Sequence, residues 1–330
     1  MISNLQILRA FAALNVVLLH TLYTANSYEL PTRNFTALGK SEWGNSGVDL
    51  FFVISGFVMI YTQWQKPKPA YEFFKNRVFR IVPLYWALTL AFATIYIVMP
   101  SAFRDTSITI TDYVSSLLFV SNIVADKNPL LFIGWTLEYE MLFYVLFSIG
   151  ILFPSKFVKF LFPVTVLISL ALFTEVDFIV LEFIFGMIAA VIFLKVPSVK
   201  FALPVFLAGV IMLGADVFSE SDLHRSLKWG IPSFFIVLSA CYLRQLKNRI
   251  LILLGDASYS IYLIQIFTIA IFYKLTRWIP EFVPNDFIIV SCVIFTAIAG
   301  IMLYYMFEMP LVKLTKKIWG TSPYKSVAAE

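Results

Sequence analysis

The sequence predicts an all-α polytopic integral membrane protein with about ten transmembrane helices. Of its 330 residues, 60% are hydrophobic and 14% are charged, and the mean hydropathy is +0.85. A soluble domain is nearer half apolar and a quarter charged. Apolar stretches long enough to cross a bilayer recur from one end of the chain to the other. We therefore expect a single transmembrane domain over residues 1–312 and a short basic cytoplasmic tail over residues 313–330.

The expected spans are apolar runs of about 20 residues, the length that a helix needs to cross the hydrocarbon core. Their residue ranges, in chain order, are 5–24, 47–64, 79–99, 132–153, 157–174, 178–194, 201–218, 229–244, 257–276 and 287–307. The first run superficially resembles a signal peptide. It lacks a convincing small-residue cleavage site and carries His20, so we interpret it as a retained span.

The charged loops predict the orientation. If the N-terminus is cytoplasmic, the cytoplasmic loops hold about twice as many Lys and Arg residues as the outer loops, and both termini are then cytoplasmic. The apolar segment 112–125 is short. If it were an eleventh span, every later loop would change sides and the bias would disappear, so we expect a re-entrant or surface helix there.

The polar composition excludes some functions. The net charge of +5 comes from Lys and Arg in short loops between spans, a pattern that reflects membrane orientation and does not indicate a nucleic-acid surface. Cys241 and Cys292 lie in apolar runs with neither a pairing pattern nor metal-ligand spacing. We expect membrane lipids around the protein, no nucleic-acid partner and no metal site.

Arg9 and His20 are the most informative pair of residues. They lie eleven residues apart on the first expected span. Eleven steps of 100° end about 20° past three full turns, so both side chains leave the helix on the same face, about 16 Å apart along its axis. Ionisable groups inside a membrane are costly and usually functional. The pair therefore predicts one polar path through the protein interior, which we call the lane. It has a cation towards one side of the membrane and an imidazole towards the other.

The predicted orientation places a group of ionisable side chains near the outer side: His20, Asp49, Glu138 and Glu140. An imidazole beside a carboxylate is suited to general-base catalysis, because the carboxylate orients the ring and stabilises the imidazolium. Glu138 and Glu140 are about 200° apart on a helix, so at most one can face the lane. These residues can also have purely structural roles: Asp49 can cap a helix, and the two glutamates can stabilise the dipole of a helix at its N-terminus. Glu182, inside a span, needs a partner.

A second group lies near the cytoplasmic side: Arg9, Arg77, Arg80 and Tyr259. Arg77 and Arg80 are three residues apart and share a helical face, which suits a phosphate or diphosphate group. Basic residues beside a span more often act as orientation anchors, and that alternative stays open for this pair.

Several sequence motifs, taken together in order, resemble those of the membrane acyltransferase type 3 family. They are LQILRAFAALNVVLLH (5–20), GNSGVDLFFVISGFVM (44–59), FFKNRVFRIVPLYW (73–86), GWTLEYEMLFYVLF (134–147), LEFIFGMIAA (181–190), LLGDASYSIYLIQ (253–265) and FEMPL (307–311). Within that family the chain is most similar to bacterial exopolysaccharide O-acetyltransferases of the succinoglycan-modifying type.

The resemblance implies a multi-pass enzyme of the bacterial cytoplasmic membrane. Such an enzyme takes an acyl group, usually acetyl, from acyl-CoA in the cytoplasm and delivers it to a hydroxyl of an extracytoplasmic glycan or lipid-linked glycan. Acetyl-CoA is then a substrate, and no metal is involved.

Carried over by motif, the resemblance makes His20 the essential histidine and Arg9 its partner. It assigns donor binding to Arg77, Arg80 and Tyr259, and an acidic role to Glu138 or Glu140. Relatives often carry His where this chain has Gln265.

Two other classes of protein remain alternatives. A transporter or flippase for a lipid-linked sugar would favour paired repeats and broken helices that meet at the midplane, and neither pattern is visible in the sequence. A non-catalytic scaffold for a glycan-assembly complex would tolerate replacement of all the ionisable residues named above.

Overall fold

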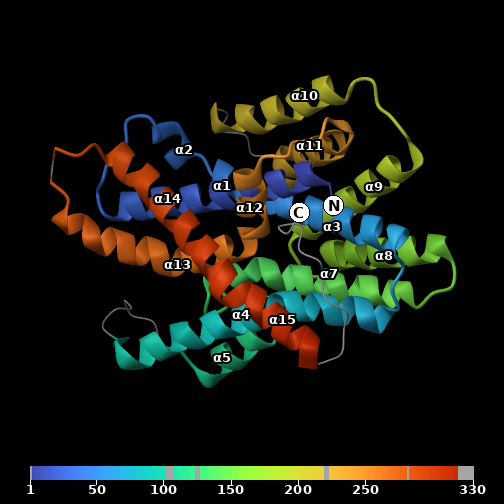
Figure 1. Ribbon diagram of the computed structural model, residues 1–330, viewed down its shortest axis with the longest axis horizontal. Coiled ribbons are helices and arrows are strands. Elements are labelled where there is room, and N and C mark those ends of the chain that lie inside the picture. Colours follow the sequence, from blue (N-terminus) through green and yellow to red (C-terminus); the bar gives the residue numbers. More distant parts are fainter. Residues whose placement is uncertain (1, 101–107, 123–126, 219–222, 281, 319–330) are drawn as a thin grey trace.

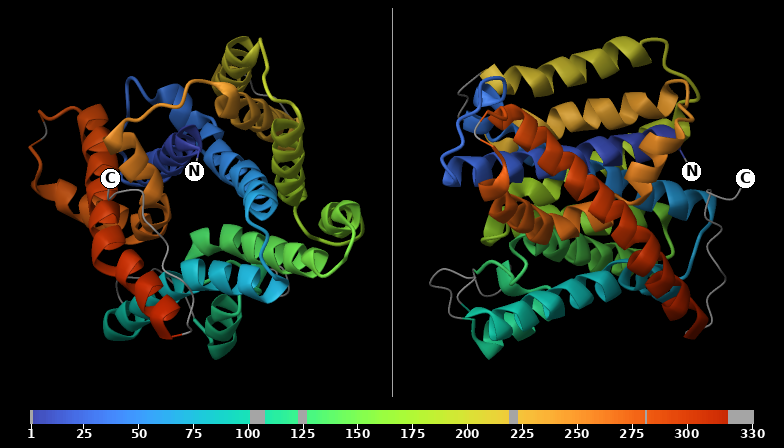
Figure 2. Two further views of the ribbon diagram at one scale, coloured as in Figure 1. Left: turned by 45° about the vertical axis from the view of Figure 1, so that its right-hand side comes forward. Right: turned by 60° about the vertical axis from the view of Figure 1, so that its left-hand side comes forward.

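The computed structural model describes residues 2–100, 108–122, 127–218, 223–280 and 282–318, and these residues contain helices but no β-strand. Figure 1 shows a bundle of helices, with the start of the chain near its centre. The views in Figure 2 place α10 and α11 along one edge and α4 and α5 along the opposite edge, with α1 and α3 between them. The predicted all-α class is confirmed.

Each of the ten expected spans coincides with a helix of the structure. These helices are α1 (Ser3–Ser27), α3 (Ser46–Gln65), α4 (Ala70–Val98), α7 (Trp135–Ile151), α8 (Lys156–Phe173), α9 (Leu181–Lys195), α10 (Ala202–Ala215), α11 (Ile231–Tyr242), α13 (Ser258–Leu275) and α14 (Asn285–Leu303). Within the described residues, eight helical runs are long and apolar enough to cross a membrane. The two shorter helices are α10 and α11, with 14 and 12 residues. The cytoplasmic location of the termini stays a prediction.

Shorter elements join these helices. They are α2 (Thr36–Lys40), η1 (Trp43–Asn45), α5 (Ile110–Leu117), η3 (Phe132–Gly134), η4 (Phe178–Val180), η5 (Asp216–Phe218), the π-helical turn η6 (Ser226–Gly230), α12 (Arg249–Asp256), η7 (Thr276–Trp278), the π-helical turn η8 (Tyr304–Glu308) and α15 (Met309–Ile318). Helical structure thus continues into the first six residues of the expected tail over 313–330, and residues 319–330 lie outside the described part of the chain.

The segment expected to be a re-entrant or surface helix over 112–125 contains α5, which has eight residues and is about 12 Å long. That length is far too short to cross a bilayer, so α5 is not an eleventh span. A capping box starts the helix: the Thr109 side chain accepts from the amide of Asp112, and the Asp112 carboxylate accepts from the amide of Thr109. Residues 123–126 lie outside the described residues.

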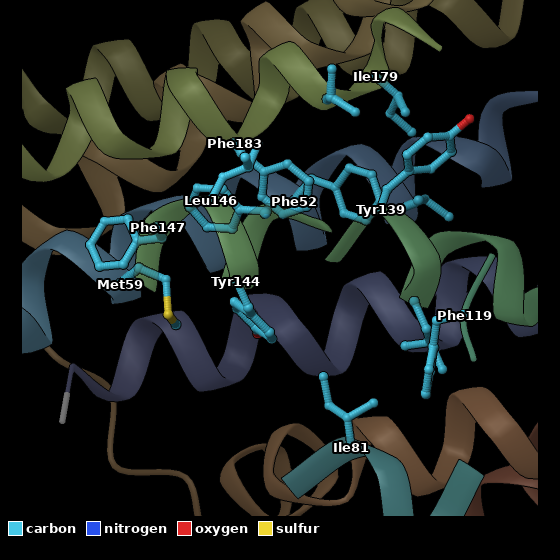
Figure 3. Close-up of a cluster of buried hydrophobic side chains, with 14 of the residues drawn as sticks. Phe52, Met59, Ile81, Phe119, Tyr139, Tyr144, Leu146, Phe147, Ile179 and Phe183 are labelled. Atoms are coloured by element: carbon cyan, nitrogen blue, oxygen red, sulfur yellow. The ribbon is translucent and has the colours of Figure 1, made fainter. Parts of the chain in front are cut away.

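Glycine allows α3 and α9 to cross at close range. A Cβ atom on Gly56 would lie 2.1 Å from the carbonyl oxygen of Phe183, and one on Gly186 would lie 2.0 Å from that of Val53. Small residues of this kind let transmembrane helices approach backbone to backbone. The crossing orients the rings beside it, and Phe52 stacks on Phe183 at 4.4 Å between centroids (Figure 3).

Helix α1 is the buried centre of the bundle. It packs against α3, α12, α13 and α14. At its start, a Cβ on Gly255 of α12 would lie 2.0 Å from the carbonyl oxygen of Gln6, so α12 lies directly against the turn that precedes Arg9. Both cysteines of the chain are free and buried, as expected of small core residues.

Candidate active site

An internal cavity between α1, α3, α4, α7 and α13 contains the predicted phosphate-binding residues. It is lined by Arg9, Arg77, Arg80, Tyr259 and Glu140, among others, and it has an empty volume of about 790 Å³ when its open mouth is counted. The first four are the residues that the sequence placed near the cytoplasmic side. The structure therefore brings this group together, from three different helices.

The arginines reach the cavity from two helices. Arg77 and Arg80 share a face of α4, and the Arg77 guanidinium lies over the rings of Phe73 and Tyr144, 5.5 and 5.8 Å from their centroids. Arg9, on α1, donates from Nη1 to Oε1 of Gln6 at 3.3 Å. Cation–π contacts thus hold the Arg77 guanidinium, and a side-chain hydrogen bond holds that of Arg9.

Acidic groups partly balance this positive charge. Glu140 lines the cavity and accepts hydrogen bonds from the hydroxyls of Tyr144 and of Ser55, the latter at 3.1 Å. Burial raises the pKa of Asp256, at the end of α12, although the nearby charges of Arg9 and Arg80 oppose the shift. Since three arginines and one glutamate line the cavity, its charge favours an anionic ligand such as a phosphate or diphosphate.

Tyr259 lines the cavity with its ring, but its hydroxyl is engaged elsewhere. It donates to the backbone carbonyl of Ile81 at 2.7 Å and so ties α13 to α4 beside the arginine pair. The neighbouring Ser260 donates to the carboxylate of Glu308 in η8. The motif that contains Tyr259 thus fixes the positions of three helical segments around the cavity.

Within the described residues, the His20 side chain forms one side-chain hydrogen bond, with Gln265. The imidazole Nδ1 lies 2.9 Å from Oε1 of Gln265, and the Gln265 Nε2 donates to the backbone carbonyl of Tyr262 at 2.8 Å. Because that carbonyl can only accept, the amide nitrogen faces Tyr262 and the amide oxygen faces His20. Nδ1 therefore carries the proton, and Nε2 keeps a lone pair that can accept one.

The surroundings of His20 restrict its ring. Gln265 is buried, with 1% of its surface exposed, and the His20 ring meets the ring of Phe132 edge to face at 5.2 Å. His20 itself is half-buried. An oriented imidazole with one free nitrogen and partial exposure is suited to act as a general base.

The carboxylates expected to support His20 lie elsewhere, which corrects the predicted pairing. Asp49 accepts from the Arg225 guanidinium at 2.8 and 3.3 Å. Gly47 packs against Ala12 and Val16, so Asp49 lies near the level of Ala12, about two turns from His20. The residue that holds the ring is the amide Gln265, 245 positions along the chain.

Glu138 and Glu140 point in different directions, as their 200° separation on a helix requires. Glu140 faces the basic cavity. Glu138 is fully buried and accepts from the backbone amides of Ser121 and Asn122 at 2.9 and 2.7 Å, so it holds the segment that follows α5. The structure therefore brings neither glutamate to His20.

The cavity stops short of His20. Its far end is lined by Thr136 and Tyr262, whose hydroxyls are 2.9 Å apart, and Tyr262 also donates to the carbonyl of Ile133 at 3.0 Å. His20 touches Phe132 and Gln265, which lie four residues before Thr136 and three after Tyr262. One helical turn, about 5 Å, therefore separates the cavity from the imidazole. The single lane expected between Arg9 and His20 is interrupted by this hydrogen-bonded wall.

Arg225 is a half-buried charge in the segment between the expected spans 201–218 and 229–244. Its guanidinium pairs with Asp49, packs against Trp229 at 5.4 Å from the ring centroid, and lies near the carboxyl group of Glu182. The ion pair between Arg225 and Asp49 joins residues 176 positions apart, so no local sequence pattern predicts it. Arg225 supplies a countercharge for both acids, including the Glu182 that needed a partner.

Comparison with known proteins agrees with these features. Residues 2–306 match the model of a protein family described as an acyltransferase domain. The exopolysaccharide production protein ExoZ of Rhizobium meliloti (strain 1021) is 32% identical over 311 residues, which cover 87% of this chain and 95% of that protein. No solved structure matches. By the extent of these matches, the chain belongs to the acyltransferase 3 family of membrane acyltransferases.

Proposed function

We propose that this protein is a transmembrane O-acyltransferase that moves an acetyl or other small acyl group from acyl-CoA to a hydroxyl of an extracytoplasmic glycan. The observation that carries the proposal is the arrangement of two sites: a cavity lined by three arginines, and an oriented imidazole one helical turn beyond its closed end. The likeness to an exopolysaccharide production protein supports exopolysaccharide as the class of acceptor. A bacterial cytoplasmic membrane is the setting that this reaction requires.

The donor binds with its charged and uncharged parts in different places. Arg9, Arg77 and Arg80 hold the phosphates of coenzyme A, which are too costly to desolvate inside hydrocarbon. The less polar pantetheine arm extends along the cavity towards Thr136 and Tyr262. The thioester then lies at the wall next to His20, while the nucleotide remains among the arginines.

His20 acts as the general base. Its Nε2 takes the proton of the acceptor hydroxyl while the hydroxyl oxygen attacks the thioester carbonyl, forming an ester bond and breaking the carbon–sulfur bond. The proton passes to the leaving thiolate, so the products are acylated glycan and coenzyme A. Gln265 supports the transient imidazolium through the Nδ1 hydrogen bond. Transfer through an acyl group on Nε2 would use the same lone pair.

Reaction requires the wall between the two sites to open. The Tyr262 and Thr136 hydroxyls and the Ile133 carbonyl form it, and rotation of the Tyr262 side chain breaks both of its hydrogen bonds. Each such bond contributes about 1 kcal/mol net, an amount that donor binding can supply.

The test is acetyl transfer by the purified full-length protein in proteoliposomes, with radiolabelled acetyl-CoA and unacetylated exopolysaccharide from a host that lacks the protein. His20→Ala should reduce turnover by at least about 100-fold, the usual contribution of a general base. The matched control is His224→Ala. This second histidine contacts the ring of Phe178 and accepts from the amide of Ser226, so its contacts lie away from the His20 site. Wild-type turnover by His20→Ala would refute the proposed mechanism, and a wild-type protein that leaves the thioester intact would refute the function.

A further inference from the structure

A second hollow lies beyond His20, at the ends of α1 and α13 and the start of α14. It is lined by Tyr28, Tyr273, Lys274, Arg277 and Asn285, among others, with an empty volume of about 1240 Å³ including its open side. We call it the α13 groove. It does not share a lining residue with the basic cavity, so it is a separate feature of the molecule.

The α13 groove is in register with the His20 site. His20 pairs with Gln265. Eight residues later on both segments, Tyr28, the residue that follows α1, contacts Tyr273 of α13 at 5.4 Å between ring centroids. Eight residues of helix span about 12 Å. Between the two pairs, the Tyr273 hydroxyl donates to the backbone carbonyl of Thr21 at 3.0 Å. Helices α1 and α13 therefore run in parallel from the imidazole to the groove.

Two cations face this groove. Lys274 and Arg277 are exposed and three residues apart, so they lie on one side of the α13 end. Neither forms an ion pair with a carboxylate of the described residues, and the Arg277 guanidinium lies over the Trp278 ring at 5.2 Å from its centroid. With the predicted orientation, both lie on the outer side of the membrane, where Lys and Arg are depleted.

We infer that the α13 groove binds an acidic substituent of the acceptor glycan, a carboxylate or a phosphate, about 12 Å from the hydroxyl that receives the acyl group. The inference rests on the proposed function. Lys274 and Arg277 supply the countercharges, and the partly exposed ring of Tyr28 supplies a flat apolar surface for a sugar residue. A short oligosaccharide spans the distance, so the groove selects an acidic glycan and places a neighbouring sugar at His20.

The experiment compares three full-length proteins in phosphatidylcholine proteoliposomes: wild type, Lys274→Gln with Arg277→Gln, and a control with Arg33→Gln and Lys40→Gln. The control removes the same charge from two exposed residues outside the groove. The acceptor is unacetylated exopolysaccharide oligosaccharide from a host that lacks the protein, used untreated, carboxyl-reduced or dephosphorylated. Initial rates of acetyl transfer give KM and kcat for each acceptor.

The groove substitutions should raise the KM for the untreated acceptor about 5- to 20-fold, as expected for the loss of two exposed charge contacts, with kcat retained. The treatment that removes the acidic group should raise the wild-type KM equally and abolish the difference between the proteins, which also identifies the group. The control should match wild type.

Three outcomes would overturn the inference. One is an unchanged KM in the groove variant. Another is an equal wild-type KM for untreated and treated acceptors. The third is a defect of the groove variant that appears with every acceptor and depends on adding phosphatidylglycerol, because the two cations would then bind lipid headgroups. If wild type transfers acetyl to none of the acceptors, the proposed function itself fails, and that result is distinct from all three.

Discussion

The backbone carbonyl of Tyr262 determines which atom of the Gln265 side chain faces His20. It accepts from the Gln265 amide nitrogen at 2.8 Å, which leaves the amide oxygen 2.9 Å from Nδ1 of the imidazole. A neutral amide thus does the orienting that a carboxylate does in many histidine sites. The tautomer of His20 depends on a residue that has no ionisable group.

Gln265→Leu should therefore lower kcat about tenfold or more while leaving the KM for acetyl-CoA unchanged, because the imidazole loses its orientation but the donor cavity is intact. Gln265→His instead places a ring nitrogen where it can accept a hydrogen bond from Nδ1 of His20. This variant should retain much of the rate that Gln265→Leu loses. The measurement is steady-state transfer with donor and acceptor varied separately. A parallel loss of kcat and of donor affinity in Gln265→Leu would instead indicate a general packing defect.

Arg77→Gln combined with Arg80→Gln should raise the Kd for coenzyme A at least tenfold, since hydrogen bonds to charged groups are worth about 1.5–3 kcal/mol each. Titration calorimetry with the purified protein measures this change, and wild-type affinity should weaken as salt is added. Lys247→Gln combined with Arg249→Gln is the matched control, because these two exposed residues lie outside the cavity. Equal Kd values for coenzyme A in wild type and the arginine variant would show that the cavity is not the donor site.

Asp49→Asn should destabilise the fold by about 1.5–3 kcal/mol, because it removes the charge that the half-buried Arg225 guanidinium bonds to at a fully buried position. Glu182→Gln should have a much smaller effect. Its two oxygens have no hydrogen-bond partner within the described residues, so an amide of nearly the same size breaks no hydrogen bond there. Thermal unfolding in detergent, followed by tryptophan fluorescence, compares the two variants. A greater loss of stability in Glu182→Gln than in Asp49→Asn would contradict this expectation.

Gly186→Ala should disrupt the crossing of α3 and α9. The added methyl group would lie 2.0 Å from the carbonyl oxygen of Val53 and 2.7 Å from the amide nitrogen of Phe57, and backbone atoms cannot yield as a flexible side chain can. Gly214→Ala in α10 is the control, since a Cβ there meets nothing within 4 Å, and the change should be neutral or stabilising by up to about 1 kcal/mol. The same unfolding measurement applies. Similar stability of the two variants would show that the helices can separate at little cost.

The sequence was sufficient for the helical class and for the cationic half of the site. Hydrophobic length located a helix for each expected span, and the three-residue spacing of Arg77 and Arg80 placed them on one face. Helix periodicity also required Glu138 and Glu140 to diverge, as they do. These conclusions depend on local geometry, which a single sequence records.

Contacts between distant segments could not be derived in the same way. Gln265 and His20 meet because α1 and α13 pack in one register, and Arg225 reaches Asp49 from a segment that hydropathy assigns to a loop. Predicted depth alone groups Asp49 with His20. The packing of Gly47 on Ala12 and Val16 sets a different depth, and only the folded arrangement of α1 and α3 contains that information.

The wall formed by Tyr262 and Thr136 has a consequence for the cell. A protein that admits a soluble donor from one compartment and a polymer from the other is at risk of becoming a leak for protons. Here the hydroxyls of Tyr262 and Thr136 bond to each other, and Tyr262 also donates to the Ile133 carbonyl, at the end of the cavity that faces His20. In the proposed reaction, this closure means that a two-carbon unit crosses without opening a permanent path that would discharge the proton-motive force.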